Sequence, residues 1–285
     1  MSYIANLNHS LKLQRKNQIL IKRLKISDWI DSRQAEGLYY FTLQEASNTL
    51  GLTRQALARS LTRLVNNGRI VSIYHGFYLI LPVEYKSWGV LPPDWFINDL
   101  MAYLEQPYYA GLLTAADYYG ASHQKPMAFH VITSKPIRDI QCKRIKIRFF
   151  AKKDIDFSLV EQKNSQTGYI RVSCPELTVI DLLKYQNRAA GLNHIFSVLK
   201  ELAENLDSER LVEAAESEGC TAYAQRLGWL LKQTDHPEKH QKLACWIKRK
   251  QPGYVKLDPK LPMKNSSRNC EWKLLINTQI EEDFA

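Results

Sequence analysis

The chain has 285 residues, of which 45% are hydrophobic, and a formal net charge of +10 at pH 7. This length exceeds one typical domain and this apolar content is enough for packed cores, so we expect two domains. The five cysteines form no CxxC pair, which argues against a zinc finger or a disulfide framework and favours a reducing cytoplasm. The longest apolar run, residues 76–83, is too short to cross a bilayer, and the N-terminus lacks the pattern of a signal peptide. We therefore expect a cytoplasmic protein that does not interact with a membrane.

Residues 1–42 are expected to form a basic leader, a helix and a short strand. Ile26, Trp29 and Ile30 have the spacing of one helix face, within a helix expected at 19–30. Residues 38–42, after Gly37, have the composition of a strand that could become the third member of a wing. The basic leader either contacts phosphates or is a solvated, frayed arm, and the sequence leaves both open.

Residues 43–81 have the order of a winged helix-turn-helix: a helix, a turn, a second helix and a β-hairpin. Apolar residues recur at 43, 46 and 50, and Gly51 follows at a position where helices commonly end. Thr53 offers a cap for the second helix. Residues 70–74 and 77–81 are apolar strand formers joined by His75-Gly76, a two-residue hairpin turn.

The second helix of this module has one apolar face and one polar face. The apolar face is assigned to Leu57, Leu61, Leu64 and Val65. Arginine pairs with guanine and glutamine with adenine, so the polar face suits base edges and phosphates. The residues expected to bind DNA are Thr53, Arg54, Gln55, Arg59, Thr62, Arg63 and, in the hairpin turn, His75. The alternative is a generic helix pair with solvated charges.

Charge supports the DNA-binding interpretation of the N-terminal part. Residues 1–85 contain 11 Lys+Arg and 5 Asp+Glu, so this part carries +6 of the net charge of +10. A basic domain is attracted to DNA through the release of counterions from the phosphates. We expect residues 1–81 to form the DNA-binding domain, 82–93 a proline-containing linker, and 94–285 a second domain.

Beyond the linker, strands are expected early and helices late. Helical patterns at 94–104 and 114–119 precede strand candidates at 129–133, 145–150 and 169–172. A series of helices follows, at 176–185, 192–206, 208–217, 222–232 and 237–248, and a last strand at 272–276. Segregation of strands and helices favours an α+β fold over alternating βαβ units. The expected architecture is a winged helix-turn-helix followed by a larger α+β domain with a small sheet and a late helical series.

Three motifs in the second part carry a family resemblance. The first comprises Tyr108, Tyr109, Gly111, Leu112, Leu113, Thr114, Ala115, Ala116, Tyr119, Gly120, Gln124 and the run Phe129-His130-Val131. The second is Ser173-Cys174-Pro175-Glu176-Leu177-Thr178 with Asp181-Leu182-Leu183, and the third runs from Ala222 to Leu231. Together with the winged helix, these motifs resemble the AbiE-type antitoxins, regulators of type IV toxin–antitoxin systems and of phage defence. One departure from the family pattern is the basic leader before Ile19, which is longer than the leader that the family core has, so its role stays open.

The resemblance implies two activities. The N-terminal domain would bind double-stranded DNA at repeated promoter sites and repress its own operon. The C-terminal domain would counter a cognate toxin with a nucleotidyltransferase fold, by direct contact or functionally. From the residues alone, Tyr108, Tyr109, Leu112 and Leu113 are expected in the core. Asp181 is expected to be a solvated or capping carboxylate rather than a catalytic one.

A cationic strip follows the expected strand at 129–133. Alternation around residues 145–149 is strand-like, so Lys146 and Arg148 are expected on one sheet face. The strip is either a solvated face or a contact for nucleic acid or for an acidic patch on the toxin. The residues assigned to this contact are Lys143, Arg144, Lys146, Arg148, Lys152 and Lys153.

No catalytic residue, metal ligand or cofactor is assigned. Asp154 or Asp156 followed by Glu161-Gln162-Lys163 faintly resembles a nuclease metal site, but such spacing is common by chance. His236 and His240 are separated by Pro237 and have no evident third ligand. We therefore expect a non-enzymatic protein. The alternative function is a metabolite-responsive repressor whose second domain binds a small molecule in a tyrosine-lined pocket.

Overall fold

The computed structural model describes residues 25–121, 126–189, 191–264 and 266–280. The basic leader, apart from Lys25, lies outside these residues. The chain divides into two compact units. The first comprises the described residues up to Glu105 together with 140–146 and 164–169, and the second comprises 106–139, 147–163 and the described residues from Ile170 on. Each unit is described by itself.

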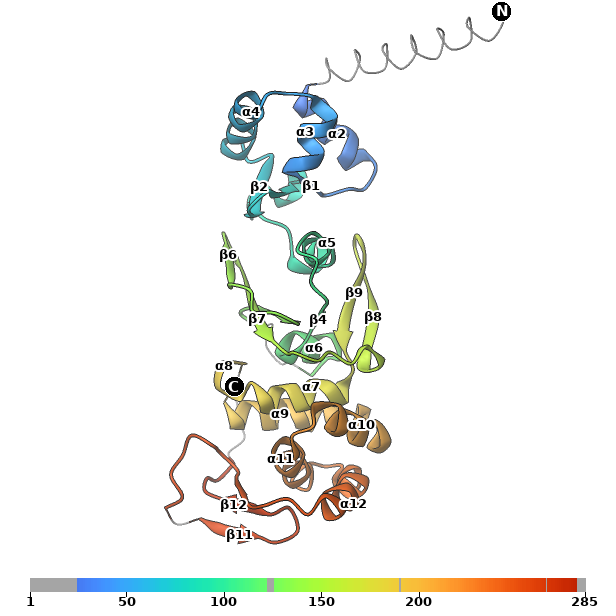
Figure 1. Cartoon of the computed structure of the whole chain (residues 1–285), viewed down its shortest axis with the longest axis vertical. Helices are drawn as coiled ribbons and strands as arrows, with labels where there is room; N and C mark the ends of the chain where they lie inside the picture. Colours follow the sequence, from blue (N-terminus) through green and yellow to red (C-terminus); the bar gives the residue numbers. More distant parts are fainter. Residues whose placement is uncertain (1–24, 122–125, 190, 265, 281–285) are drawn as a thin grey trace, which may run out of the picture. The chain divides into compact units, whose positions relative to one another are not determined.

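The first unit contains the expected helix-turn-helix and wing (Figure 1). Its elements in chain order are α2 (Ile26–Ala35), β1 (Tyr40–Thr42), α3 (Leu43–Leu50), α4 (Arg54–Asn66), β2 (Ile70–Tyr74) and β3 (Phe77–Ile80). The strands form an antiparallel sheet in the order β1-β3-β2, so residues 38–42 do supply the third strand of the wing. A core that includes Ile30, Phe41 and Leu57 joins the helices to the sheet.

Local signals explain the boundaries of these helices. The Thr42 hydroxyl accepts the Glu45 amide, and the Glu45 carboxylate accepts the Thr42 amide, which makes a capping box for α3. Gly51 ends α3 with a φ of 59°, a backbone conformation that favours glycine. Thr53 then caps α4 by accepting the Ala56 amide at 3.3 Å. These contacts fix the turn that separates the two helices.

The segment expected as an extended linker is packed. Two 3-10 turns occupy Val83–Tyr85 and Pro93–Trp95, and Val90 and Leu91 are fully buried. The helix α5 (Ile97–Tyr103) follows, and the first unit continues to Glu105. The segment packs because the apolar residues between its prolines are removed from water, whereas an extended connector would leave them exposed.

The second unit contains most of a six-stranded mixed sheet with the strand order β6-β7-β5-β4-β9-β8. Its strands are β4 (Tyr108–Ala110), β5 (Phe129–Thr133), β6 (Ile140–Cys142), β7 (Ile145–Ala151), β8 (Val160–Ser165) and β9 (Gly168–Ser173). β4 pairs antiparallel with β5 and parallel with β9, and β5 pairs parallel with β7. The three expected strands are present, and β4, β6 and β8 were not expected.

Helices follow the sheet, as the α+β pattern predicts (Figure 1). They are α6 (Leu112–Tyr118, between β4 and β5), α7 (Pro175–Lys184), α8 (Gln186–Ala189), α9 (Leu192–Leu202), α10 (Ser208–Glu218), α11 (Thr221–Leu231) and α12 (Gln241–Lys250). The buried helix α7 contacts α6, α9, α10 and α11. The predicted placement of Tyr108, Tyr109 and Leu112 in the core is confirmed, since all three are buried, and Leu113 is half-buried against the same core.

A small three-stranded sheet completes the second unit. Its strands are β10 (Val255–Lys256), β11 (Ser267–Asn269) and β12 (Leu274–Ile276), with β12 in the middle. Trp272, which is fully buried, lies against Gly228 of α11, where an added Cβ would come within 2.0 Å of the indole ring. Gln225 of α11 donates from Nε2 to the Trp272 and Lys273 carbonyls, both at 3.0 Å. The glycine therefore makes room for the indole, and the glutamine holds the sheet on the helix.

Candidate nucleic-acid interface

The outer face of α4 exposes the polar residues expected there. Leu57, Leu61 and Leu64 are buried against the core of the unit. Thr53, Arg54, Gln55, Arg59, Thr62 and Arg63 are all exposed. Val65 is 39% exposed, so its assignment to the apolar face was wrong: position 65 lies on the flank of the helix, next to a hollow rather than in the core.

The arginines of this face differ from Arg33 and Arg69 of the same unit. Within the described residues, Arg54, Arg59 and Arg63 form no ion pair. By contrast, Arg33 donates to the Tyr40 carbonyl at 2.9 Å, and Arg69 pairs with Asp31. A guanidinium without a protein partner keeps all five of its N–H donors for a ligand. The face of α4 therefore offers three arginines that are chemically available to a ligand.

Two neighbouring features extend this face. His75 is exposed in the turn between β2 and β3, where Gly76 has a φ of 77° and the Tyr103 hydroxyl donates to the His75 carbonyl at 3.0 Å. A hollow of about 650 Å³ lies beside α4. It is lined by residues of α3, α4 and the wing, including Leu43, Ser47, Arg54, Thr62, Val65 and Tyr78. The hydroxyl of Thr62 donates to the Ala58 carbonyl at 3.0 Å, which leaves its lone pairs as acceptors.

The cationic strip is only partly a surface. Ile147 and Phe149 are buried while Lys146 and Arg148 are half-buried, so the expected alternation along β7 is present. Arg148 donates to the Arg188 carbonyl at 3.0 Å. Lys143, Arg144 and Lys153 are exposed. Lys152 is 4% exposed, and its assignment to the strip was wrong.

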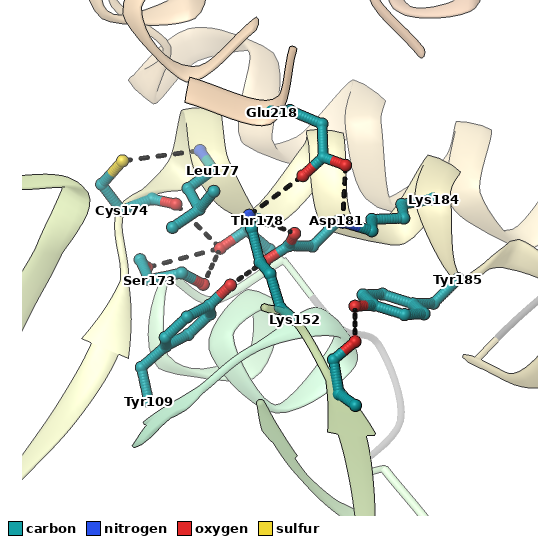
Figure 2. A network of polar contacts seen from close by, with 11 residues as sticks. Tyr109, Lys152, Ser173, Cys174, Leu177, Thr178, Asp181, Lys184, Tyr185 and Glu218 are labelled. Carbon is teal, nitrogen blue, oxygen red and sulfur yellow. Dashed lines mark hydrogen bonds and ion pairs between the residues drawn. The ribbon is translucent and has the colours of Figure 1, made fainter. Parts of the chain in front are cut away.

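Lys152 belongs instead to a buried ionic network (Figure 2). Its Nζ lies 3.1 Å from Asp181 Oδ1 and 3.2 Å from Glu218 Oε2. Glu218 also pairs with Lys184, and the Tyr109 hydroxyl donates to Asp181 Oδ2 at 2.6 Å. Asp181 is fully buried, so the expectation of a solvated or capping carboxylate was wrong. Its position on the inner face of α7 places it where only paired charges are tolerated.

Two opposing effects act on the buried ion pair: burial raises the pKa of the Asp181 carboxyl, while the nearby Lys152 ammonium and the Tyr109 hydroxyl act to lower it. Burial acts to lower the pKa of Lys152, but the carboxylates of Asp181 and Glu218 outweigh it, and the pKa lies above its ordinary value. Burial, with the charge of Asp181, raises the pKa of the Tyr109 hydroxyl. The phenol therefore stays protonated and donates to the carboxylate. The network joins β4, β7, α7 and α10, which indicates a structural role.

Comparisons with known protein families give a match for each of two segments of the chain. The model of a family described as "AbiEi antitoxin C-terminal domain" matches residues 109–233, and one described as "Transcriptional regulator, AbiEi antitoxin" matches residues 30–80. Together the two matched segments make up more than half of the chain. The chain belongs to the AbiEi antitoxin family. The predicted resemblance is confirmed, with a transcriptional regulator domain at the N-terminus and an antitoxin domain after it.

A solved structure supports the fold of the antitoxin. It is the crystal structure of the RV2827C protein from Mycobacterium tuberculosis, with a TM-score of 0.65 and 15% sequence identity. The alignment covers 87% of this chain and 90% of that one, so the likeness extends over most of both. The expected α+β architecture is confirmed. A search of curated protein sequences gives no significant match.

The acidic and histidine motifs of the antitoxin do not come together as a metal site. Glu161 pairs with Lys163 at 2.8 Å and accepts the Tyr119 hydroxyl at 3.1 Å. His236 and His240 face different carboxylates, Glu238 and Glu271. No group of three histidine, cysteine or acidic residues suited to a metal ion occurs in the described ranges. The same ranges hold no helix long and apolar enough to span a bilayer.

The cysteine of the second family motif, Cys174, is enclosed at the start of α7. Cys174, which begins the helix α7, is fully buried, and burial raises the pKa of its thiol to about 12. The thiol accepts the Leu177 amide at 3.5 Å, as a weak cap. Thr178 donates to the Cys174 carbonyl at 2.8 Å and shares a hydrogen bond of 2.7 Å with Ser173. Because its thiol is protonated and enclosed, Cys174 serves here as a weak cap of α7.

Proposed function

We propose that this antitoxin represses its own operon, with residues 1–81 binding double-stranded DNA at promoter repeats. The observation that carries the proposal is the outer face of α4, where three arginines that form no ion pair with the described part of the chain lie on the same helix as Gln55 and Thr62. In a helix-turn-helix the second helix enters the major groove and its exposed side chains reach the base edges. His75, at the tip of the wing, would contact the backbone beside the helix.

The decisive measurement is the affinity of α4 variants for the antitoxin's own promoter. Arg59→Ala and Arg63→Ala should each weaken promoter binding by about 1–3 kcal/mol if the arginine reads a base, because a bidentate contact is lost. Fluorescence anisotropy with a labelled promoter duplex measures the change. Lys86→Ala, which removes an exposed cation of the same unit away from α4, is the matched control and should change the affinity little. Promoter affinity unchanged in both arginine variants would show that α4 is not the recognition helix.

We further propose that the second domain, residues 94–285, counters a cognate toxin with a nucleotidyltransferase fold, while 82–93 links the domains. The match of residues 109–233 to the antitoxin domain supports this division of labour. The accessible cations at the start of the strip, Lys143, Arg144 and Lys146, are proposed to contact an acidic patch of the toxin or nucleic acid. Arg148 and Lys153 belong to the same proposed contact.

Co-expression with the toxin separates the two activities. Full-length chains expressed from an unrelated promoter are scored for rescue of growth. The Arg59→Ala, Arg63→Ala double variant should rescue as well as the wild type, because the α4 face serves DNA only. Arg144→Glu with Lys146→Glu should lower rescue or promoter binding, because the charge of the proposed contact is reversed.

Three results would count against this assignment. Failure of the wild-type chain to rescue growth would remove the toxin from the proposal. Loss of rescue in the folded arginine variant would mean that antitoxin action needs the DNA-binding face. Full rescue and full promoter binding in the Arg144→Glu, Lys146→Glu chain would leave the strip as a solvated surface. Circular dichroism checks that each variant is folded.

The metabolite-responsive alternative gains no support from the geometry. Tyr108 and Tyr109 are packed in the core rather than in a pocket. A hollow of about 450 Å³ in the second unit, between α10 and α12, is lined by Glu209, Val212, Gln241, Lys242, Cys245 and Arg249, none of which is a tyrosine. We propose a non-enzymatic regulator that acts in the cytoplasm, where its promoter and its toxin would be found.

A further inference from the structure

The stretch from residue 239 to residue 273 is strongly basic and lies outside both segments that match the family. It contains ten lysines and arginines and two acidic residues, Asp258 and Glu271. Both acidic side chains are engaged: Asp258 accepts the Lys260 amide at 2.9 Å, and Glu271 pairs with Lys232 at 2.7 Å. The cations of this stretch therefore create an excess of positive charge that no acid within it balances.

Strand register shows where some of these cations lie. Lys256 of β10 and Arg268 of β11 both pair with Leu275 of β12, so their side chains leave the sheet on the same face. Tyr254 precedes Lys256 by two residues and therefore shares that face. The neighbouring register, Val255 with Leu274, faces the other way and packs against the core of the unit.

This outer face forms one surface around a tyrosine. Tyr254 is 40% exposed. The Arg268 guanidinium lies 5.8 Å and the Lys273 ammonium 5.3 Å from the centre of its ring. We call Tyr254, Lys256, Arg268 and Lys273 the Tyr254 surface. Within the described residues, neither Arg268 nor Lys273 forms an ion pair.

The helix before the sheet supplies further charge. Lys248, Arg249 and Lys250 are consecutive exposed cations in the last turn of α12, which is joined to Tyr254 by residues 251–253. Lys250 lies 5.4 Å from the centre of the Trp246 ring, and none of the three forms an ion pair within the described residues. Cations at a helix C-terminus are favoured by the helix dipole, so their presence alone is unremarkable. These three cations matter because they precede Tyr254 by only a few residues and so add positive charge to the same part of the chain.

We propose that the Tyr254 surface binds the phosphodiester backbone of a nucleic acid. The Lys256 ammonium donates to the Leu261 carbonyl at 2.9 Å, whereas Arg268 and Lys273 form no ion pair within the described residues and contact the Tyr254 ring. A flat aromatic ring among such cations is the pattern of proteins that hold nucleic-acid strands, where the cations meet phosphates and the ring stacks on a base. A protein partner would need exposed apolar anchors at the centre of the contact, whereas on this face the cations Lys256 and Arg268 flank the half-buried Leu275. The surface gives the antitoxin a nucleic-acid contact separate from α4.

The experiment uses the full chain with Arg59→Ala and Arg63→Ala, so that failure of the proposed promoter contact cannot affect the result. Two probes distinguish the sources of the backbone: a DNA duplex of scrambled promoter sequence and a short single-stranded RNA. Arg268→Gln with Lys273→Gln should reduce the slope of log affinity against log salt concentration. The expected change is about 0.9 for each lost phosphate contact on the duplex and about 0.7 on the single strand.

A second variant reports on the ring. If the ligand is single-stranded, Tyr254→Ala should weaken RNA binding by about 5- to 150-fold, because stacking contributes about 1–3 kcal/mol per base. Duplex binding should change little, since paired bases are not available to the ring. The matched control is Lys135→Gln with Arg138→Gln, two exposed cations elsewhere in the same unit.

The outcomes decide the proposal. A smaller salt slope with either probe in the Arg268→Gln, Lys273→Gln chain, and not in the control, supports it. Slopes that match the parent chain with both probes overturn it, and so does an equal reduction in the control, which would indicate net charge alone. Unchanged binding of both probes combined with loss of toxin rescue would show that the surface meets a protein, and would also overturn it.

Discussion

Replacing Lys152 with methionine should destabilise the second unit by about 3–5 kcal/mol, because the change leaves Asp181 buried without its cationic partner. Asp181 is fully buried, and the Tyr109 hydroxyl is the other group that stabilises its charge. The same change removes one of the two cations that pair with Glu218. Calorimetric unfolding of the full chain, with the transition of the second unit assigned separately, measures the loss.

The neighbouring residue provides the control. Lys153 is exposed, so Lys153→Met should alter the free energy of unfolding by no more than about 0.5 kcal/mol. If the two methionine variants unfolded alike, Lys152 would behave as a surface lysine and the ionic network would not stabilise the unit. The comparison also tests whether the residue could act in the cationic strip, since a buried ammonium cannot meet a partner.

Removing the Trp272 side chain should cost about 3–5 kcal/mol, since the indole is fully buried and its loss leaves a cavity over α11. Gly228 leaves the backbone of α11 open to the ring and has no side chain of its own to fill the space. Urea denaturation of the Trp272→Ala chain, followed by circular dichroism, measures the change.

An exposed tryptophan is the matched control for this substitution. Trp88 is 49% exposed and makes an edge contact with Tyr85. Trp88→Ala should therefore cost far less than Trp272→Ala. Equal losses would mean that the Gly228–Trp272 contact contributes no more than a surface ring does, and that the small sheet is held on α11 by hydrogen bonds such as those of Gln225 and Arg226.

The winged helix-turn-helix was predictable because its signals are local. Capping by Thr53, termination at Gly51 and the His75-Gly76 turn each depend on a few neighbouring residues, and the structure contains all three. Val65 was wrongly assigned to the apolar face of α4. Periodicity gives the direction of each side chain around the helix axis, but not how far around the helix the buried face extends. Its flank borders a hollow in the unit, which no pattern within α4 reveals.

The ionic network could not be predicted, because its partners are brought together by tertiary structure. Lys152 follows β7, Asp181 lies in α7 and Glu218 ends α10. In the sequence, Lys152 stands among exposed cations, and only burial distinguishes it from Lys153. The strand β4 was missed for a related reason. It is only three residues long, which is too short to give a recognisable sequence pattern. It is a strand because it pairs with β5 and β9.

The positive charge of residues 239–273 is visible in the sequence, but its arrangement on the fold is not. Its charge was visible as a count of ten cations against two acids. What the count could not show was the register that places Tyr254, Lys256 and Arg268 on one face, since β10 and β11 are short and separated by a loop. Only the pairing of β10 and β11 with the middle strand β12 shows that these residues lie on one surface.

The central position of β12 sets an order of events during synthesis. β10 and β11 both hydrogen-bond to β12 and not to each other, yet both leave the ribosome before it. Until β12 emerges, neither strand has the strand partner it has in the folded sheet, and Trp272 is not yet in place over Gly228. The nascent antitoxin therefore acquires its Tyr254 surface only after every preceding helix has been made, so a chain stalled before β12 would carry the regulator domain without that surface.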